Sequence, residues 1–238
     1  YSHGLAAITL CEAFAMTNDL ELKAPAQMSL DFIVNAQDPV GGGWRYFPRE
    51  GGDTSVIGWQ LMALKSGHMG NLKIPPATIQ GCYKFLDSVT ADSGATYGYN
   101  SPGSGQATTA IGLLCRMYMG WKKEEPALQR GVDQLAKWGP SITPKGENLY
   151  YNFYATQVML HTGGKHWDVW NKQLRDYLVA SQEKGNDHSR GSWAIGSDKG
   201  TLAGGRLYKT ALAAMILEVY YRHMPIYANQ VAEDEFSR

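Results

Sequence analysis

The sequence has no excess charge of either sign and no clustered metal ligands. Its 238 residues include 22 Lys and Arg against 22 Asp and Glu. This balance gives no reason to expect nucleic acid or an acidic surface as a partner. The three cysteines, Cys11, Cys82 and Cys115, lie far apart inside apolar patterns. They predict small buried side chains and exclude a disulfide framework or a structural zinc site.

Long apolar runs are also missing. No run reaches the length of about 20 residues that a membrane-spanning helix needs, so we expect no transmembrane segment in this chain. No signal peptide is visible, and Tyr1 leads almost directly into the helical pattern HGLAAITLCEAFAM. We therefore expect the chain to be a piece of a longer protein, and its start indicates no compartment.

What the sequence does contain is a repeat of apolar helical segments. Aliphatic and aromatic residues make up 44% of the chain and charged residues 18%, which predicts a substantial core. Five strongly apolar segments recur about every 50 residues, a period that fits one helix pair and its loop. The positions on which these segments align are Gly4, Ser55, Thr109, Thr156 and Thr210.

Four amphipathic segments alternate with the apolar ones. Pro25 marks the expected start of the first, over 24–37. Each has one apolar stripe and a charged opposite face, as in 75–89, where Ile79, Cys82, Leu86 and Val89 share a face. We predict an all-α array of about nine helices, with apolar inner helices alternating with outer ones. This repeat domain covers residues 1–226, and 227–238 form a C-terminal tail.

Glycine-rich loops follow the outer segments, and two of them carry a specific pattern. It reads Phe32-Ile33-x3-Gln37…Gly42-Gly43-Trp44, and again Tyr177-Leu178-x3-Gln182…Gly191-Ser192-Trp193. The pattern resembles the QW repeat of squalene and oxidosqualene cyclases. The C-terminal GGRLYKTALAAMILEVYYRH is similar to the closing helix of prenyltransferase and squalene-oxidase repeat proteins. The resemblance implies the α/α toroid of the terpenoid cyclase and protein prenyltransferase superfamily, here as a partial ring.

The QW positions are expected to be structural. A Gln amide can satisfy backbone groups at a helix end while the Trp indole packs on the neighbouring hairpin. We therefore interpret Gln37, Trp44, Gln182 and Trp193 as structural clamps.

The resemblance also implies the DxDDTA acid motif of hopene-type cyclases. Laid onto this sequence, the motif falls on residues 50–55, and Gly52 stands where the family has its proton-donating Asp. Glu50 and Asp53 remain as catalytic candidates. Arg49 nearby favours the ionised form of Asp53, and an Asp directly before an apolar helix is typical of an N-cap. We expect Asp53 to cap a helix, with a carboxylate facing the cavity as the alternative.

Zinc-assisted prenyl transfer is the second chemistry that the resemblance implies. It would need an Asp-x-Cys pair and a His near the start of an inner helix. The sequence has no Asp-x-Cys pair, and Tyr208-Lys209-Thr210 stands where the family carries Tyr-His-Thr. The six histidines are scattered, with no HxH or HExxH spacing. We expect neither a metal nor another cofactor.

Aromatic residues on or beside the inner segments are the remaining functional signal. They can line a lipid cavity, stabilise a carbocation, or fill the space between helices. The residues expected at a ligand cavity are Trp59, Tyr118, Tyr150, Tyr154 and Tyr208.

Three functions follow from these patterns. The preferred one is a non-catalytic toroid domain that acts in binding or assembly within a larger protein, because the helical framework is preserved while the acid and the zinc ligands are missing. The alternatives are an isoprenoid cyclase or prenyltransferase, and a lipid- or glycan-binding module that uses the central cavity. The expected partner is an apolar isoprenoid or lipid ligand, or another protein.

Overall fold

The computed structural model describes residues 1–143, 146–196, 198–222 and 236. Over these residues the chain is all-α, as the sequence predicts, with ten α-helices and one very short β-hairpin. Most of the predicted tail, 227–238, lies outside the described residues, and of its side chains only Phe236 is described.

Five of the helices form an inner row: α1 (Ser2–Thr17), α3 (Thr54–Met69), α5 (Gln106–Tyr118), α7 (Leu149–Thr162) and α9 (Lys199–Leu217). Four outer helices alternate with them: α2 (Leu20–Ala36), α4 (Pro76–Val89), α6 (Pro126–Trp138) and α8 (Gly164–Ser181). The remaining elements are the short helix α10 (Val219–Arg222), the strands β1 (Thr90–Ala91) and β2 (Thr96–Tyr97), and the 3₁₀ turn η1 (Asp92–Gly94).

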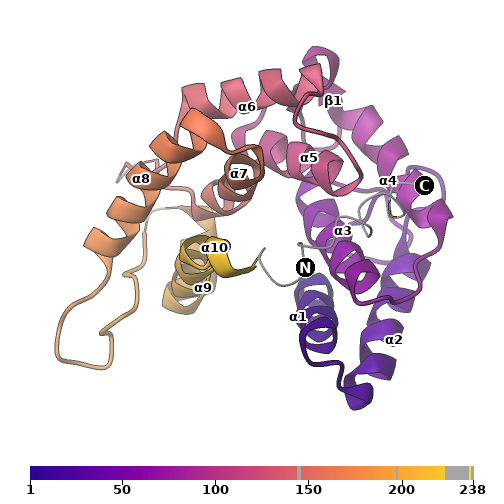
Figure 1. Cartoon of the computed structure of the whole chain (residues 1–238), viewed down its shortest axis with the longest axis horizontal. Coiled ribbons are helices and arrows are strands. Elements are labelled where there is room, and N and C mark those ends of the chain that lie inside the picture. The colour runs from indigo at the N-terminus through magenta and orange to yellow at the C-terminus, as the bar shows by residue number, and fades with distance from the viewer. Residues whose placement is uncertain (144–145, 197, 223–235, 237–238) are drawn as a thin grey trace.

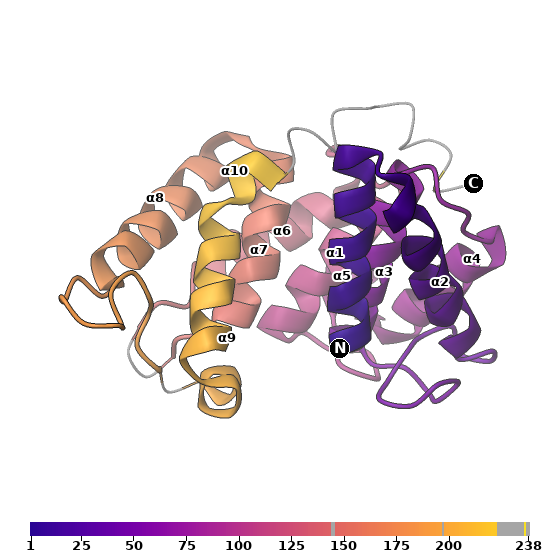
Figure 2. The ribbon, with the colours of Figure 1, turned by 90° about the horizontal axis from the view of Figure 1, so that it is seen from below.

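The inner helices follow one another in space in their chain order. Helix α1 packs on α3, α3 on α5, α5 on α7, and α7 on α9. Figure 1 shows that this row is curved, with α1 and α9 at its two ends and the outer helices on its convex side. Figure 2 shows α1 and α9 from the side, and both begin on the same side of the molecule.

How much of a helix is buried depends on its position in the inner row or outside it. In α3, which lies between α1 and α5, every residue from Val56 to Gly67 is buried. In the outer helix α4 the buried residues form one stripe that includes Ile79, Cys82 and Leu86. Leu207 of α9, the helix at one end of the row, is 82% exposed.

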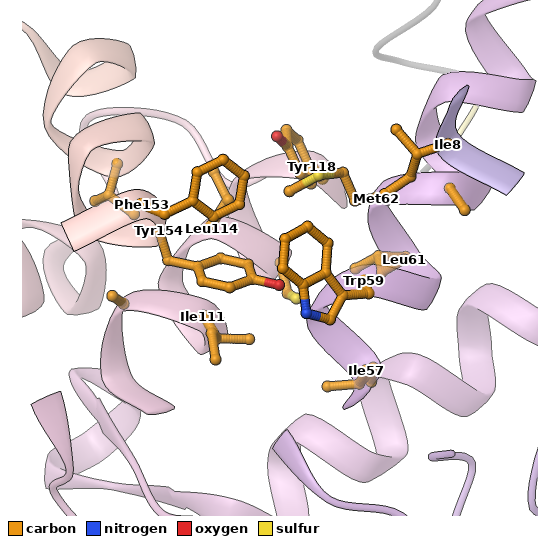
Figure 3. Close-up of a cluster of buried hydrophobic side chains, with 14 of the residues drawn as sticks. Ile8, Ile57, Trp59, Leu61, Met62, Ile111, Leu114, Tyr118, Phe153 and Tyr154 are labelled. Atoms are coloured by element: carbon orange, nitrogen blue, oxygen red, sulfur yellow. The ribbon is translucent and has the colours of Figure 1, made fainter. Parts of the chain in front are cut away.

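Figure 3 shows how the inner helices share the core. Its labelled side chains come from α1, α3, α5 and α7, and the Trp59 ring lies among them. Trp59 stacks on Phe153 with ring centroids 5.3 Å apart and an interplanar angle of 17°. The edge of Tyr154 meets the same indole at 5.4 Å. Offset-stacked and edge-to-face pairs of this kind stabilise a core beyond their area of burial.

One predicted helix start is wrong. Helix α2 begins at Leu20 and carries Pro25 in its interior. Its N-cap is Asp19, whose carboxylate accepts the amide of Glu21 at 3.0 Å. An N-cap of this kind satisfies a backbone donor that the first helical turn leaves unpaired, and it therefore sets where the helix begins.

Candidate ligand cavity

The cavity of interest lies at the amino ends of the inner helices and has a volume of about 600 Å³. Its walls come from α1 and α3 on one side and from the starts of α7 and α9 on the other, so it spans the two ends of the curved row. The lining residues are Tyr1, Leu5, Trp59, Asn148, Tyr150, Asp198, Lys199, Gly200 and Tyr208. Lining residues are exposed on both walls, including Leu5 on α1, at 40%, and Lys199 on α9.

An aromatic wall joins α3 to α7 in this cavity. The Trp59 and Tyr150 rings lie 6.2 Å apart at an angle of 48°. The Tyr150 hydroxyl donates a hydrogen bond of 2.9 Å to the carbonyl of Ser55, which holds the Tyr150 ring against the first turn of α3. The wall is therefore fixed by both packing and a hydrogen bond.

The opposite wall depends on a kink in α9. Gly205 has a φ of 67° inside this helix, a backbone conformation that residues with a Cβ rarely adopt. The kink folds the first turn of α9 back onto Tyr208. A Cβ on Gly200 would lie 2.6 Å from the Tyr208 hydroxyl oxygen, so glycine is needed for this close approach. The two glycines together shape the α9 side of the cavity.

The phenols of the cavity stay neutral around pH 7. Burial raises the pKa of Tyr1 to about 12, against the opposing effect of its hydrogen bond with Ser55. Burial and the nearby Asp198 carboxylate raise the pKa of Tyr208 to about 12. Burial also raises the pKa of Tyr150 well above its usual value. Neutral phenols offer hydroxyl donors in apolar surroundings, where hydrogen bonds are strong.

Asp53 caps α3 and does not line the cavity. Its Oδ1 accepts the amides of Ser55 and Val56 at 2.9 and 3.0 Å, and the Ser55 hydroxyl at 2.6 Å. Its Oδ2 accepts the Tyr99 hydroxyl at 2.8 Å and lies 3.8 Å from Arg45 Nε. The side chain is fully buried, and both of its oxygens have partners. The N-cap expected from the sequence is therefore the observed arrangement.

The two other acids to consider are Glu50 and Asp198. Glu50 is exposed on the 37–53 loop, away from the lining residues. Asp198 does line the cavity, and it is the N-cap of α9. It accepts the amides of Gly200 and Thr201 at 2.9 and 3.1 Å and the Thr201 hydroxyl at 2.6 Å. Asp198 is the one carboxylate among the described lining residues, so no pair of acids converges there.

No group of three His, Cys, Asp or Glu side chains able to hold a metal occurs within the described part of the chain. At the position where the resembled family carries a His, Lys209 Nζ lies 2.7 Å from Glu147 Oε2, and both side chains are buried. The other oxygen of Glu147 accepts the Tyr177 hydroxyl at 2.7 Å. This ion pair joins the segment before α7 to α9.

The two Gln–Trp pairs lie outside the cavity and make equivalent hydrogen bonds. The Trp44 indole donates to the carbonyl of Ile33 at 2.7 Å. The Trp193 indole donates to the carbonyl of Leu178 at 2.9 Å. Each of these carbonyls belongs to the residue four positions before the Gln of the pair.

The Gln amides hold the loops. Gln37 donates to the carbonyls of Gly42 and Thr78 at 2.8 and 2.9 Å, so it links its own loop to the first turn of α4. Gln182 donates to the carbonyl of Gly191 at 2.8 Å.

The expected cavity residues are divided among three places. Trp59, Tyr150 and Tyr208 line the cavity. Tyr118 lies at the other end of α5, where its hydroxyl donates to Gln157 at 3.1 Å. Tyr154 is fully buried beneath the aromatic wall, and a Cβ on Gly58 would lie 2.9 Å from its hydroxyl oxygen.

Several lining residues are missing from the sequence-based set. They are Tyr1, Leu5, Asn148, Asp198, Lys199 and Gly200. Asn148 and Asp198 are the N-caps of α7 and α9. Because the inner helices begin on one side of the molecule, their cap residues could have been used to find this site. Tyr1 and Leu5 carry no comparable signal.

Comparison of the chain with protein-family models, curated proteins and solved structures gives no match. Among the described helices, none has both the length and the apolar character needed to cross a bilayer. The cavity is therefore the feature of this chain that bears on function.

Proposed function

We propose that this chain is a toroid-type helical repeat domain that binds an apolar small molecule of the isoprenoid or lipid class in the cavity at the amino ends of its inner helices. The observation that carries the proposal is the cavity of about 600 Å³ walled by Leu5, Trp59, Tyr150 and Tyr208. Sites for small molecules typically have volumes of about 300–1,000 Å³ and combine apolar walls with a few placed polar groups.

The polar groups of the cavity indicate what the ligand carries. The neutral phenol of Tyr208 can donate a hydrogen bond, and Asn148 and Lys199 add further donors, whereas the Tyr1 hydroxyl donates to Ser55 and offers a ligand an acceptor. A ligand with an apolar body and one oxygen-bearing end, such as an isoprenoid alcohol, would satisfy both kinds of wall. A large charged ligand would leave the aromatic wall without an apolar partner.

The curved row supports the toroid proposal. Successive inner helices pack on each other, and the outer helices lie on the convex side, as in a ring built from helical hairpins. The matching hydrogen bonds of Trp44 and Trp193 support a repeat of one structural unit.

Binding is favoured over cyclase chemistry by the position of Asp53. Protonation of a carbon–carbon double bond needs a strong acid that faces the substrate in a dry cavity. The Asp53 oxygens accept hydrogen bonds from α3 and from Tyr99, and the residue is not part of the cavity wall. A side chain used in this way contributes to helix stability instead.

The proposal is tested by titrating farnesol, a C15 isoprenoid alcohol, into the purified chain while Trp fluorescence is recorded. Binding is expected to change the emission, because Trp59 is part of the wall. Leu5→Asp places a charge at the cavity edge and is expected to weaken binding about tenfold or more, since an unpaired charge disfavours an apolar partner. Met16→Asp is the matched control, because Met16 is an exposed apolar residue of the same helix, at 63% exposure, that does not line the cavity.

Equal affinities for the two Asp variants would contradict binding in this cavity. Mass spectrometry of lipid extracted from the purified protein gives a second measurement, and a co-purifying isoprenoid or lipid that Leu5→Asp loses would support the proposal. Turnover of squalene or a prenyl diphosphate that Asp53→Asn abolishes would overturn it in favour of an enzyme.

A further inference from the structure

A second cavity lies at the opposite, carboxyl ends of the inner helices. It has a volume of about 180 Å³. Its lining comes from the ends of α3, α5 and α7 and from the turn after α5: Lys65, Met117, Tyr118, Gly120, Trp121, Lys122, Lys123 and His161. We call this set the basic pocket. It is separate from the cavity that carries the proposed function and shares no lining residue with it.

Positive charge in the basic pocket comes from its lysines. Lys65 projects from α3 and is only 3% exposed, whereas Lys122 and Lys123 lie on the surface. Burial, together with the charges of Lys123 and Lys65, lowers the pKa of His161 to about 4, so this ring is neutral near pH 7. Glu12 of α1 accepts the hydroxyl of Ser66, the residue after Lys65, at 3.3 Å. The pocket therefore suits an anionic group.

One residue from the far end of the chain lies against this region. The ring of Phe236 is 4% exposed. It lies 4.9 Å from Lys65 Nζ and 5.0 Å from the ring of His68. A buried lysine over an aromatic face is a cation–π contact, and it is stronger when water is excluded. Lys65 thus contributes both to the Phe236 contact and to the basic pocket beside it.

The sequence around Phe236 has the complementary charge. Three acidic residues precede it directly, in the order Glu233, Asp234, Glu235. An acidic stretch is attracted to a cluster of lysines at a distance, and an aromatic side chain gives the contact its specificity. The basic pocket and the C-terminal stretch EDEF are therefore chemically matched.

We propose that the basic pocket and the adjoining surface of Lys65 and His68 are a docking site for an acidic–aromatic peptide, and that the chain's own C-terminal segment, anchored by Phe236, occupies it. Because the segment is tethered, its effective concentration is in the range of about 1 mM, and a free peptide of the same chemistry has to compete with it. The site is thus self-occupied, and displacement of the segment exposes it.

The test uses the full-length chain and a fluorescein-labelled peptide, VAEDEFSR, that copies residues 231–238. Fluorescence anisotropy is expected to show the peptide binding Phe236→Ala about tenfold or more tighter than the wild-type chain, because the tethered competitor is weakened. Phe47→Ala, which removes a 72% exposed ring that does not line the basic pocket, is the control and is expected to behave as the wild type.

Two changes test the chemistry of the contact. A peptide with Ala in place of Phe, and one with Gln-Asn-Gln in place of Glu-Asp-Glu, are both expected to bind Phe236→Ala about tenfold more weakly than VAEDEFSR. Lys122→Gln combined with Lys123→Gln in the Phe236→Ala chain is expected to weaken binding and reduce its dependence on salt. These two lysines are on the surface, so their replacement leaves the core intact.

Equal binding of VAEDEFSR to the wild-type and Phe236→Ala chains would overturn the proposal, as would equal binding of the three peptides. A second measurement avoids the Phe236 variant altogether. Hydrogen exchange at the C-terminal segment is expected to be faster in the Lys122→Gln, Lys123→Gln chain than in the wild type. Unchanged exchange would show that the lysines do not hold the segment, and the proposal would fail.

Discussion

The buried ion pair between Glu147 and Lys209 offers the sharpest test of how the ligand cavity is held together. The two residues lie 2.7 Å apart with side-chain exposures of only 4% and 9%. Each is adjacent in sequence to a lining residue, since Asn148 follows Glu147 and Tyr208 precedes Lys209. Loss of the pair is therefore expected to affect both stability and ligand binding.

Lys209→Met removes the cation and leaves the Glu147 carboxylate buried with Tyr177 as its remaining hydrogen-bond partner. Breaking a buried pair in this way costs about 3–5 kcal/mol, because the remaining charge has lost its solvation and its partner. For a chain of this size, that cost corresponds to a decrease in melting temperature of roughly 6–20 °C. Urea unfolding followed by circular dichroism measures the change in free energy of unfolding.

Two further variants separate the causes. Glu147→Gln together with Lys209→Met removes both charges while keeping an acceptor for Tyr177, and it is expected to recover at least about half of the lost stability. Lys172→Met is the control: Lys172 and Asp176 lie 2.8 Å apart, but both are exposed, and no measurable change is expected. If the free energy of unfolding of Lys209→Met were within about 1 kcal/mol of the wild-type value, the reasoning would be refuted, because a buried charge without its partner is expected to destabilise the fold by more than this.

Three more outcomes are expected. The half-buried, neutral His161 has a folded-state pKa of about 4, below its unfolded value of 6.5. Its contribution of roughly 3 kcal/mol to the free energy of unfolding is therefore present above pH 6.5 and is lost as the pH falls towards 4. Urea unfolding at pH 7.5 and pH 4.5 should therefore show a smaller loss of stability in His161→Gln than in the wild type, and equal losses would contradict this. Trp44→Phe removes the donor to the Ile33 carbonyl and is expected to lower the free energy of unfolding by about 1–3 kcal/mol. Trp138→Phe is the control, because Trp138 belongs to neither Gln–Trp pair. Gly205→Ala, at a φ of 67°, is expected to cost about 1–2 kcal/mol and to weaken farnesol binding; unchanged affinity would show that the α9 kink does not shape the cavity.

Much of the helical framework was predictable from local pattern. The stripe of Ile79, Cys82, Leu86 and Val89 is buried in α4, as its spacing predicts, because residues three and four apart share a helix face. The three cysteines are buried and free, as expected from their apolar surroundings. The start of α2 was mispredicted because Asp19 caps the helix well before Pro25, and a proline does not by itself mark the first turn.

The candidate site was predictable only in part. Asp53 could be interpreted as a cap because capping is a local interaction between a side chain and the next few amides. The separation of Tyr118 and Tyr154 from Trp59, Tyr150 and Tyr208 could not be predicted. All five residues lie on inner helices, and which other helix each ring meets depends on how the helices pack against one another.

The amino-acid sequence by itself determined the helices, their alternation between apolar and amphipathic types, and the caps that begin several of them. These features depend on hydrophobic periodicity and on contacts within a few residues, and both are set by residues that are close together in the sequence. Only the tertiary structure decided where the candidate cavity forms. The cavity combines residues from 1–5, 59, 148–150 and 198–208. The curvature of the helical row brings these segments together, and that curvature results from packing angles between helices that no single segment encodes.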